Sequence, residues 1–248
     1  MAASVTAALL IIGDEILSGR TKDKNIGYIA EYLTGMGVEL REVRVVPDDE
    51  AEIVAALNAL RARYTYLFTT GGIGPTHDDI TADCVAKAFG VSIDVDPRAV
   101  AMMRQRYQPE DLNEARLRMA RIPAGADLIE NIISKAPGFR IGNVFVMAGV
   151  PAIMQSMLDS IAPSLSTGTP VIAEAIEAEG IPEGIYAQGL GEIAAARPTV
   201  SIGSYPSFSA TGFRNQIVVR GKDPGAVADA VAAVHDLLRR LKSDGAPL

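Results

Sequence analysis

Cysteine is almost absent from the sequence, and basic residues do not exceed acidic ones. Cys84 is the single cysteine, so no disulfide can form within the chain, and its place on an apolar helix face favours core packing. Lysine and arginine together number 23, against 30 aspartates and glutamates, which gives a net charge of −7. Because nucleic-acid binding requires clustered Lys and Arg, we expect no nucleic-acid partner.

Long apolar runs, heptads and internal repeats are also missing. The apolar run from Ala7 to Ile12 is too short to cross a bilayer and follows no basic start, so we expect neither a membrane segment nor a signal peptide. With 248 residues, 48% of them hydrophobic, the chain suffices for one large or two modest domains with a substantial core. Together these features predict a cytoplasmic globular protein without a membrane partner.

The most informative stretch of the sequence runs from Thr69 to Thr81. A β-branched and aromatic run from Tyr64 to Phe68 precedes it and predicts a strand. Apolar residues spaced as on one face of a helix follow it, and Gly90 stands where a left-handed helix end is expected. The stretch is therefore predicted to be a strand-to-helix turn.

Glycines and carboxylates are combined within this turn. Gly71, Gly72 and Gly74 let backbone amides approach an anion closely, which is typical of a phosphate site near a helix N-terminus. Asp78 and Asp79 would repel a phosphate unless a divalent cation lay between them. Two simpler interpretations stay open: the glycines form an ordinary tight turn, and Asp79 only caps the helix. His77 is expected to be an ordinary loop residue.

Three buried apolar runs are each followed by a polar or glycine-containing turn. Their alternation with helices predicts an α/β fold, in which a mostly parallel sheet is covered on both faces. Because the carboxyl ends of parallel strands share one edge, we expect Asp14, Glu15, Asp78 and Asp79 to converge on one crevice. For Asp14 and Glu15 a solvated loop is the alternative. The runs and their turns are Ile12 with Gly13-Asp14-Glu15, Thr70 with Gly71-Gly72, and Met147 with Ala148-Gly149.

Helices are predicted between these strands. Asn25 is expected to cap a helix with a buried stripe from Ile26 to Leu33, and Asp48 and Asp49 open the next one. The loop before the first helix carries Arg20, Lys22 and Lys24. A further helical stretch is expected from Pro97 to Arg121, interrupted at Pro109.

The pattern changes after a short linker around residues 166–170. The remainder reads β-α-β-β-α, which predicts a small α+β domain, so we divide the chain into domains 1–167 and 168–248. His235 is expected on the surface of the last helix. The expected elements are strands Val171–Ala178, Thr199–Tyr205 and Phe213–Arg220, and helices Ile181–Ala196 and Pro224–Leu241.

Several separate motifs, in order along residues 7–165, resemble the molybdopterin-binding (MoeA/MogA-like) family, in particular the N-terminal region of the competence/damage-inducible protein A group. The FAD synthase N-terminal domain is a relative. The tail resembles the KH-like domain that follows in that group. The deamidase domain of longer members has no counterpart in these 248 residues, and we expect none of its activity. The motifs are Gly13-Asp14-Glu15-Ile16-Leu17-Ser18-Gly19, Asn25, the stretch from Gly71 to Thr81, Ala136-Pro137-Gly138-Phe139 and Gly149-Val150-Pro151.

The resemblance implies a three-layer α/β/α domain that binds molybdopterin or an adenine nucleotide, and a homo-oligomer, dimer or trimer. It also implies metal-dependent hydrolysis of ADP-ribose or a related adenine dinucleotide, with magnesium or another divalent ion, and potassium as a further candidate. By motif, Asp78, Asp79 and Asp14 are the catalytic candidates, and Asp78, Asp79 and Glu15 the metal ligands. The implied substrate- or phosphate-binding residues are Gly71, Gly72, Gly74, Pro75, Thr76, Thr81, Asn25, Gly149 and Pro151.

Three positions depart from the family pattern. Ala148 replaces a proline, Ile153 a glutamate and Ser134 a glycine, all near the expected ligand edge. The departures favour an alternative function, a non-catalytic molybdopterin- or nucleotide-binding protein of the molybdenum cofactor type. Adenylation of molybdopterin is a third possibility.

Overall fold

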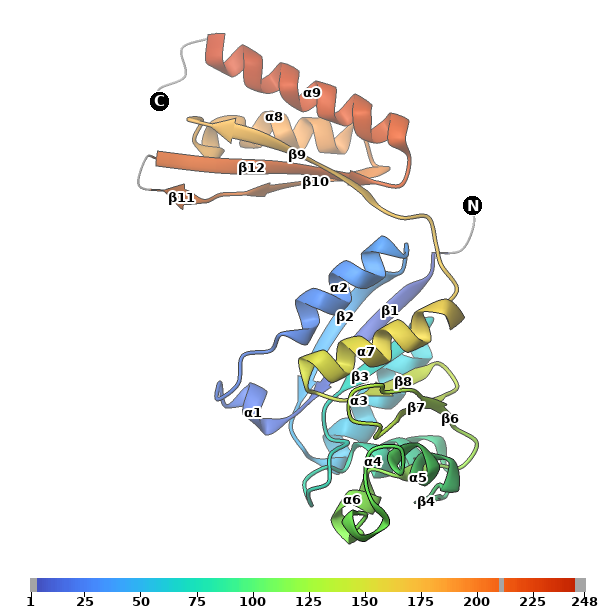
Figure 1. Ribbon diagram of the computed structural model, residues 1–248. Helices are drawn as coiled ribbons and strands as arrows, with labels where there is room; N and C mark the ends of the chain where they lie inside the picture. The colour runs from blue at the N-terminus through green and yellow to red at the C-terminus, as the bar shows by residue number, and fades with distance from the viewer. Residues whose placement is uncertain (1–3, 210–211, 244–248) are drawn as a thin grey trace. The chain divides into compact units, whose positions relative to one another are not determined.

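The computed structural model describes residues 4–209 and 212–243 and divides the chain into two compact units, Met1–Gly168 and Thr169–Leu248. Figure 1 shows the helices and strands of both units. Among the described residues, no helix has both the length and the apolar composition that a membrane crossing needs.

A mostly parallel sheet forms the centre of the first unit. Its strand order is β2-β1-β3-β8-β7-β6, with the first four strands parallel and β7 and β6 each antiparallel to the preceding neighbour. The central strands β1, β3 and β8 are buried along almost their whole length, as their continuous apolar runs predicted. The strands are β1 (Thr6–Ile12), β2 (Glu39–Val46), β3 (Tyr66–Thr70), β6 (Asp127–Ile129), β7 (Gly138–Ile141) and β8 (Val144–Met147).

Helices cover both faces of this sheet and produce two separate hydrophobic cores. Side chains of α2 and α7 pack on the face that carries Leu9 and Phe68, whereas those of α3, α4 and α5 pack on the face that carries Leu10 and Leu67 (Figure 1). The predicted α/β/α fold is thus confirmed. The helices are α1 (Asp14–Leu17), α2 (Asn25–Gly35), α3 (Glu50–Arg63), α4 (Thr81–Phe89), α5 (Pro97–Met103), α6 (Glu114–Arg118) and α7 (Pro151–Ile161), with short 3-10 turns η1 (Pro109–Asp111) and η2 (Ala162–Ser164).

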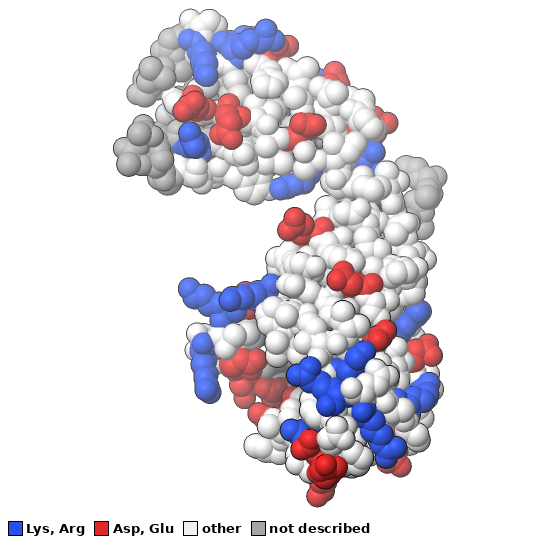
Figure 2. All heavy atoms as spheres, viewed as in Figure 1, with Lys and Arg blue, Asp and Glu red and all other residues white. Residues whose placement is uncertain are grey.

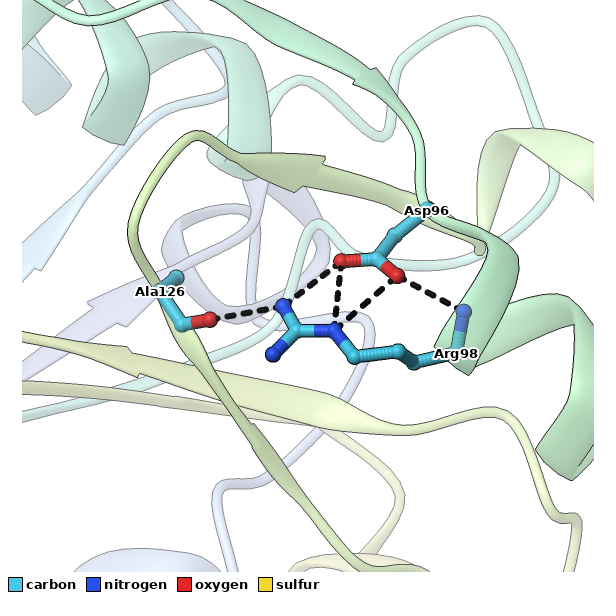
Figure 3. A network of polar contacts seen from close by, with 3 residues as sticks. All are labelled: Asp96, Arg98 and Ala126. Atoms are coloured by element: carbon cyan, nitrogen blue, oxygen red, sulfur yellow. Dashed lines mark hydrogen bonds and ion pairs between the residues drawn. The ribbon is translucent and has the colours of Figure 1, made fainter.

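The segment from 93 to 123 is less helical than predicted. α5 ends at Met103, and after η1 and α6 the chain enters β5 (Arg121–Pro123), which pairs with β4 (Ile93–Val95) in a separate two-stranded sheet. One polar network explains where α5 starts: the Asp96 carboxylate accepts from the Arg98 amide at 2.7 Å and caps the helix (Figure 3). The Arg98 guanidinium binds the same carboxylate and also donates to the Ala126 carbonyl at 2.9 Å, so it ties this helix start to the loop before β6.

The second unit is a small α+β domain, as predicted. The sheet has β12 between β10 and β9, all antiparallel, and α8 and α9 pack together over one apolar core. A Cβ on Gly189 would lie 2.6 Å from Leu237, so this glycine permits the close approach of α8 to α9. His235 is exposed, as expected. The elements are β9 (Ile172–Glu179), α8 (Glu183–Ala195), β10 (Val200–Tyr205), β11 (Phe208–Ser209), which the sequence did not predict, β12 (Gly212–Gly221) and α9 (Pro224–Ser243).

Candidate functional site

Two adjacent hollows lie at the carboxyl ends of β1, β3 and β8. The larger, which we call the main crevice, has a volume of about 530 Å³ and is lined by the turn after β3 together with Tyr107 and Ile153. The smaller, the side lobe, has a volume of about 220 Å³ and is lined by Thr70 and the loop before α2. Gly71 and Gly149 line both, so the two hollows are adjacent.

Glycine is required in the turn after β3. Gly71 has a φ of +101°, and a Cβ there would lie 2.1 Å from the Ile12 carbonyl oxygen. Gly72 has a φ of +66°, and a Cβ would lie 2.2 Å from the Thr81 hydroxyl. That hydroxyl donates to the Gly71 carbonyl at 3.0 Å, and the Thr81 amide donates to the Gly72 carbonyl at 3.0 Å. Thr81 is fully buried, so it lies behind the turn and holds its shape.

Backbone amides of this turn remain available to a ligand. The Gly71 amide donates to the Met147 carbonyl, but those of Gly72, Ile73 and Gly74 donate to no acceptor among the described residues. All three residues line the main crevice. Successive unpaired amides in a turn with left-handed glycines form a concave site for an anion.

Asp79 closes the far end of the turn. Its carboxylate accepts from the amide and hydroxyl of Thr76 at 2.8 and 2.6 Å. A Cβ on Gly74 would lie 2.6 Å from the same carboxylate. The cap position of α4 belongs to Ile80 and has no side-chain hydrogen bond, so the alternative that Asp79 caps this helix is wrong. Arg118 donates to the carbonyls of Thr76 and Asp79 and so stabilises the loop between them.

Four carboxylates gather beside the turn, and we call Asp14, Glu15, Asp48 and Asp78 the acidic rim. The Asp14 amide donates to the Asp48 carboxylate at 3.0 Å. Burial raises the pKa of Asp48, and the charges of the other three carboxylates raise it further, while the Asp14 amide opposes this. The pKa of Asp78 is lowered, chiefly because the Thr76 hydroxyl, which donates to Asp79, also lies close to it.

The structure brings only part of the predicted acidic set into the main crevice. Glu15 and Asp79 line it, whereas Asp14 does not, and the Asp78 side chain is 63% exposed. His77 beside it is 98% exposed, as expected for a loop residue. Within residues 4–209 and 212–243, no three His, Cys, Asp or Glu side chains are grouped to hold a metal. The protein residues therefore do not by themselves form the metal site predicted from Asp78, Asp79 and Glu15.

Asn25 has a different position from the one predicted. Lys24 is the N-cap residue of α2 and its side chain makes no capping bond, so the prediction that Asn25 caps the helix is wrong. The amides of Asn25 and Ile26 both donate to the Asp23 carboxylate, at 3.0 and 2.7 Å. The Asn25 side chain instead reaches across the sheet edge and donates to the Gly149 carbonyl at 2.8 Å. It thereby joins the turn after β8 to the start of α2.

The remaining predicted residues also lie at this edge. Pro75 and Pro151 line the main crevice, and Thr76 is held by Asp79. A Cβ on Gly149 would lie 3.3 Å from the Gly71 Cα atom, so the turn after β8 and the turn after β3 approach each other closely there.

Tyr107 and Asn131 are among the crevice-wall residues that the sequence did not indicate. Tyr107 follows α5, and the Arg116 guanidinium lies 4.7 Å from its ring centre. Asn131 is fully buried and holds the loop that follows it: its Oδ1 accepts from the amides of Ile133 and Ser134, and its Nδ2 donates to the Ala136 carbonyl. An Asn shortly before a Ser in a loop is a recognisable turn signal, whereas nothing local marks Tyr107.

The three positions that depart from the family pattern all line the main crevice. Ser134, Ala148 and Ile153 belong to its wall, together with Met157. Basic side chains gather over the loop between α1 and α2, next to acidic ones (Figure 2). That loop carries Arg20, Lys22 and Lys24, which have no ion-pair partner among the described residues.

Comparison with known proteins places these features in context. Residues 8–167 match a family described as a probable molybdopterin binding domain, and residues 178–244 match the FAD synthase middle domain. A protein from Aeropyrum pernix is 32% identical over 253 aligned positions, which cover 96% of this chain and 94% of that protein. A CinA-like protein from Desulfosudis oleivorans is 36% identical over 214 positions, which cover 79% of this chain and 51% of that one. The crystal structure of the protein CinA from Thermoplasma acidophilum superposes with a TM-score of 0.61 at 35% identity, over 65% of this chain and 99% of that chain.

Proposed function

The chain belongs to the family of probable molybdopterin-binding domains, as its motifs predicted, and we propose that it binds a phosphorylated heterocycle, molybdopterin or an adenine nucleotide, in the main crevice. The observation that carries this proposal is the row of unpaired amides at Gly72, Ile73 and Gly74. A phosphate accepts several hydrogen bonds at once, and backbone amides supply them without the side-chain ordering that Lys or Arg would require.

The rest of the crevice suits the other end of such a ligand. Tyr107, Met119, Ile153 and Met157 provide an apolar wall, and the volume of about 530 Å³ lies in the range typical of small-molecule sites. The unpaired cations of the α1–α2 loop offset the repulsion that the acidic rim exerts on a phosphate. A molecule with a planar apolar part and a charged phosphate therefore matches the distribution of side chains.

Isothermal titration calorimetry with molybdopterin, ADP-ribose and AMP tests this function. Ile73→Pro removes one amide donor, and Ile73→Val is the matched control because it keeps the amide and most of the side chain. Loss of a hydrogen bond to a charged group is expected to weaken binding by about 10- to 100-fold in the proline variant only. The proposal fails if none of the three ligands binds the wild-type protein at millimolar concentration. It also fails if both folded variants bind equally well.

A second candidate is hydrolysis of ADP-ribose or a related adenine dinucleotide, and the acidic rim beside the unpaired amides favours it. Carboxylates next to a diphosphate are tolerated when a divalent cation binds with the ligand. In this candidate magnesium arrives with the diphosphate, with potassium as a second candidate ion, because the described residues offer no three-ligand cluster. Release of AMP from ADP-ribose, assayed with a series of divalent ions, supports it, and tight binding without AMP release eliminates it. ATP consumption that depends on molybdopterin would indicate adenylation instead.

We also propose that the protein forms a homo-oligomer, a dimer or a trimer. Light scattering on the purified protein checks the state, and a monomer across the micromolar range would contradict it.

A further inference from the structure

Two lysines from the loop between α1 and α2 line the side lobe. Lys22 and Lys24 are both exposed, and neither ammonium group has a hydrogen-bond or ion-pair partner among the described residues. Lys87, by contrast, is paired with Glu50. Basic side chains gather over the α1–α2 loop in Figure 2. Unpaired ammonium groups at the wall of a hollow can bind an anion that enters it.

The loop that carries the two lysines is anchored at both ends. The Thr21 amide, just before the first lysine, donates to the Glu15 carbonyl at 2.9 Å. Asn25 directly follows the second lysine, and its side chain donates to the Gly149 carbonyl at 2.8 Å. Each lysine therefore extends from a fixed part of the backbone beside the lobe, and its flexible four-carbon stem lets the ammonium group reach a ligand there.

Two carboxylates, Asp23 and Glu15, also line the lobe. The Asp23 carboxylate accepts from the amides of Asn25 and Ile26, which stabilise its charge locally. The Glu15 carboxylate lies against the backbone, since a Cβ on Gly13 would be 2.5 Å from it, and it has no donor among the described residues. The two lysine ammonium groups thus outnumber the one carboxylate that lacks a donor, so the lobe favours an anion over a cation.

We propose that Lys22 and Lys24 bind the second phosphate of a diphosphate ligand whose first phosphate lies on the amides of Gly72–Gly74. This inference rests on the proposed function and narrows its ligand to a nucleoside diphosphate or a diphosphate ester such as ADP-ribose. The two hollows are adjacent, since Gly71 and Gly149 line both. The phosphates of a diphosphate share one bridging oxygen, so two adjacent anion sites match it. A monophosphate such as AMP occupies only the amides.

Variants of the loop separate a direct contact from the general effect of charge. Lys22→Gln and Lys24→Gln each remove one positive charge, and the double variant removes both. Arg20→Gln is the matched control, because Arg20 is an exposed cation of the same loop without an ion-pair partner among the described residues, and it lines neither hollow. Substitutions of exposed side chains change stability little, and thermal melts of all variants check that folding is intact.

Binding is measured by calorimetry with ADP and AMP at about 0.15 M salt, where exposed charges further apart than about 8 Å are largely screened. EDTA is present, so that no divalent ion bridges the ligand and the protein. Wild type is expected to bind ADP more tightly than AMP. Each lysine variant is expected to bind ADP about 5-fold more weakly, and the double variant about 25-fold more weakly, with AMP binding almost unchanged. Arg20→Gln is expected to weaken ADP binding by less than about 2-fold.

The failure of this inference can be told apart from that of the proposed function. An equal loss of ADP and AMP binding in the double variant overturns the inference, because the lysines would then not distinguish a second phosphate. A double variant that loses no more ADP affinity than Arg20→Gln overturns it as well, and both results leave the proposed function standing. Binding of molybdopterin by wild type without binding of ADP also overturns the inference alone. Absence of binding of all three ligands to wild type removes both.

Discussion

Replacing Gly71 by alanine tests the geometry of the turn on which the proposed site depends. An L-residue at a φ of +101° costs about 1–2 kcal/mol in backbone strain. The new Cβ would also lie 2.1 Å from the Ile12 carbonyl oxygen, which belongs to a central strand and can move only with β1. Overpacking of this kind adds about 1–3 kcal/mol. Gly71→Ala is therefore expected to lower the free energy of unfolding of the first unit by about 2–5 kcal/mol.

Gly19→Ala separates the two contributions. Gly19 has a φ of +73°, but a Cβ there would meet no atom of the described chain within 4 Å beyond the adjoining residues, so alanine brings strain without overlap. Its expected cost is about 1–2 kcal/mol. Because the chain has two units, a single unfolding transition is not expected, and hydrogen exchange of peptides from β1 and β3 in urea reports the first unit separately. Equal destabilisation by the two variants would refute the close packing of Gly71 against Ile12.

Three further predictions concern the surroundings of the turn. Thr81→Val removes the hydroxyl bond to Gly71 and should cost about 1–3 kcal/mol in the same exchange assay, with Thr81→Ser close to wild type. The pKa of Asp48 is raised in the folded protein, so its contribution to stability is present below the unfolded pKa of about 4 and is lost as pH rises. Asp48→Asn should therefore stabilise the first unit at pH 7 in the same exchange assay, and a loss of stability would contradict this. Burial raises the pKa of Cys84 to about 12, so iodoacetamide at pH 8 should label only urea-unfolded protein, and rapid labelling of native protein by mass spectrometry would contradict this.

The fold of the first unit was predictable in those segments whose structure follows from residues adjacent in the sequence. The apolar runs that end at Ile12, Thr70 and Met147 became neighbouring strands, because residues buried on both faces leave few other arrangements. The glycine turn was predictable for a related reason: a non-glycine residue at +101° or +66° is strained whatever surrounds it.

The segment from 93 to 141 was less predictable because distant residues define it. β4 pairs Ile93 with Pro123, and β7 pairs Phe139 with Val146, in strands of three or four residues that show no periodic pattern. The spacing of apolar residues after Pro97 continues past Met103, where the helix ends. Tyr107 reaches the crevice only because of these turns, so its position could not be inferred from its neighbours in sequence.

The N-terminus of α2 shows that a sequence pattern does not determine the direction in which a side chain points. Asp23 and Asn25 are both favourable near a helix N-terminus, and local propensity does not choose between them. In the structure Lys24 is the N-cap residue and the first two helix amides donate to Asp23, which leaves the Asn25 side chain for a carbonyl 124 positions away, at Gly149. Gly149 lies in the turn after β8, which contacts the turn after β3 at Gly71. That contact is visible only in the three-dimensional structure.

The directions of the side chains also change the electrostatics of the site. From the sequence, Asp78 and Asp79 together form a barrier to any phosphate unless a cation lies between them. In the structure the neighbours diverge: the Asp79 carboxylate turns inward to two donors of Thr76, and Asp78 extends towards solvent. Hydrogen bonds to a carboxylate stabilise its charge locally, and solvent screens an exposed one. Asp78 and Asp79 would therefore repel an anion near the amides of Gly72–Gly74 less strongly than their adjacency in the sequence suggests.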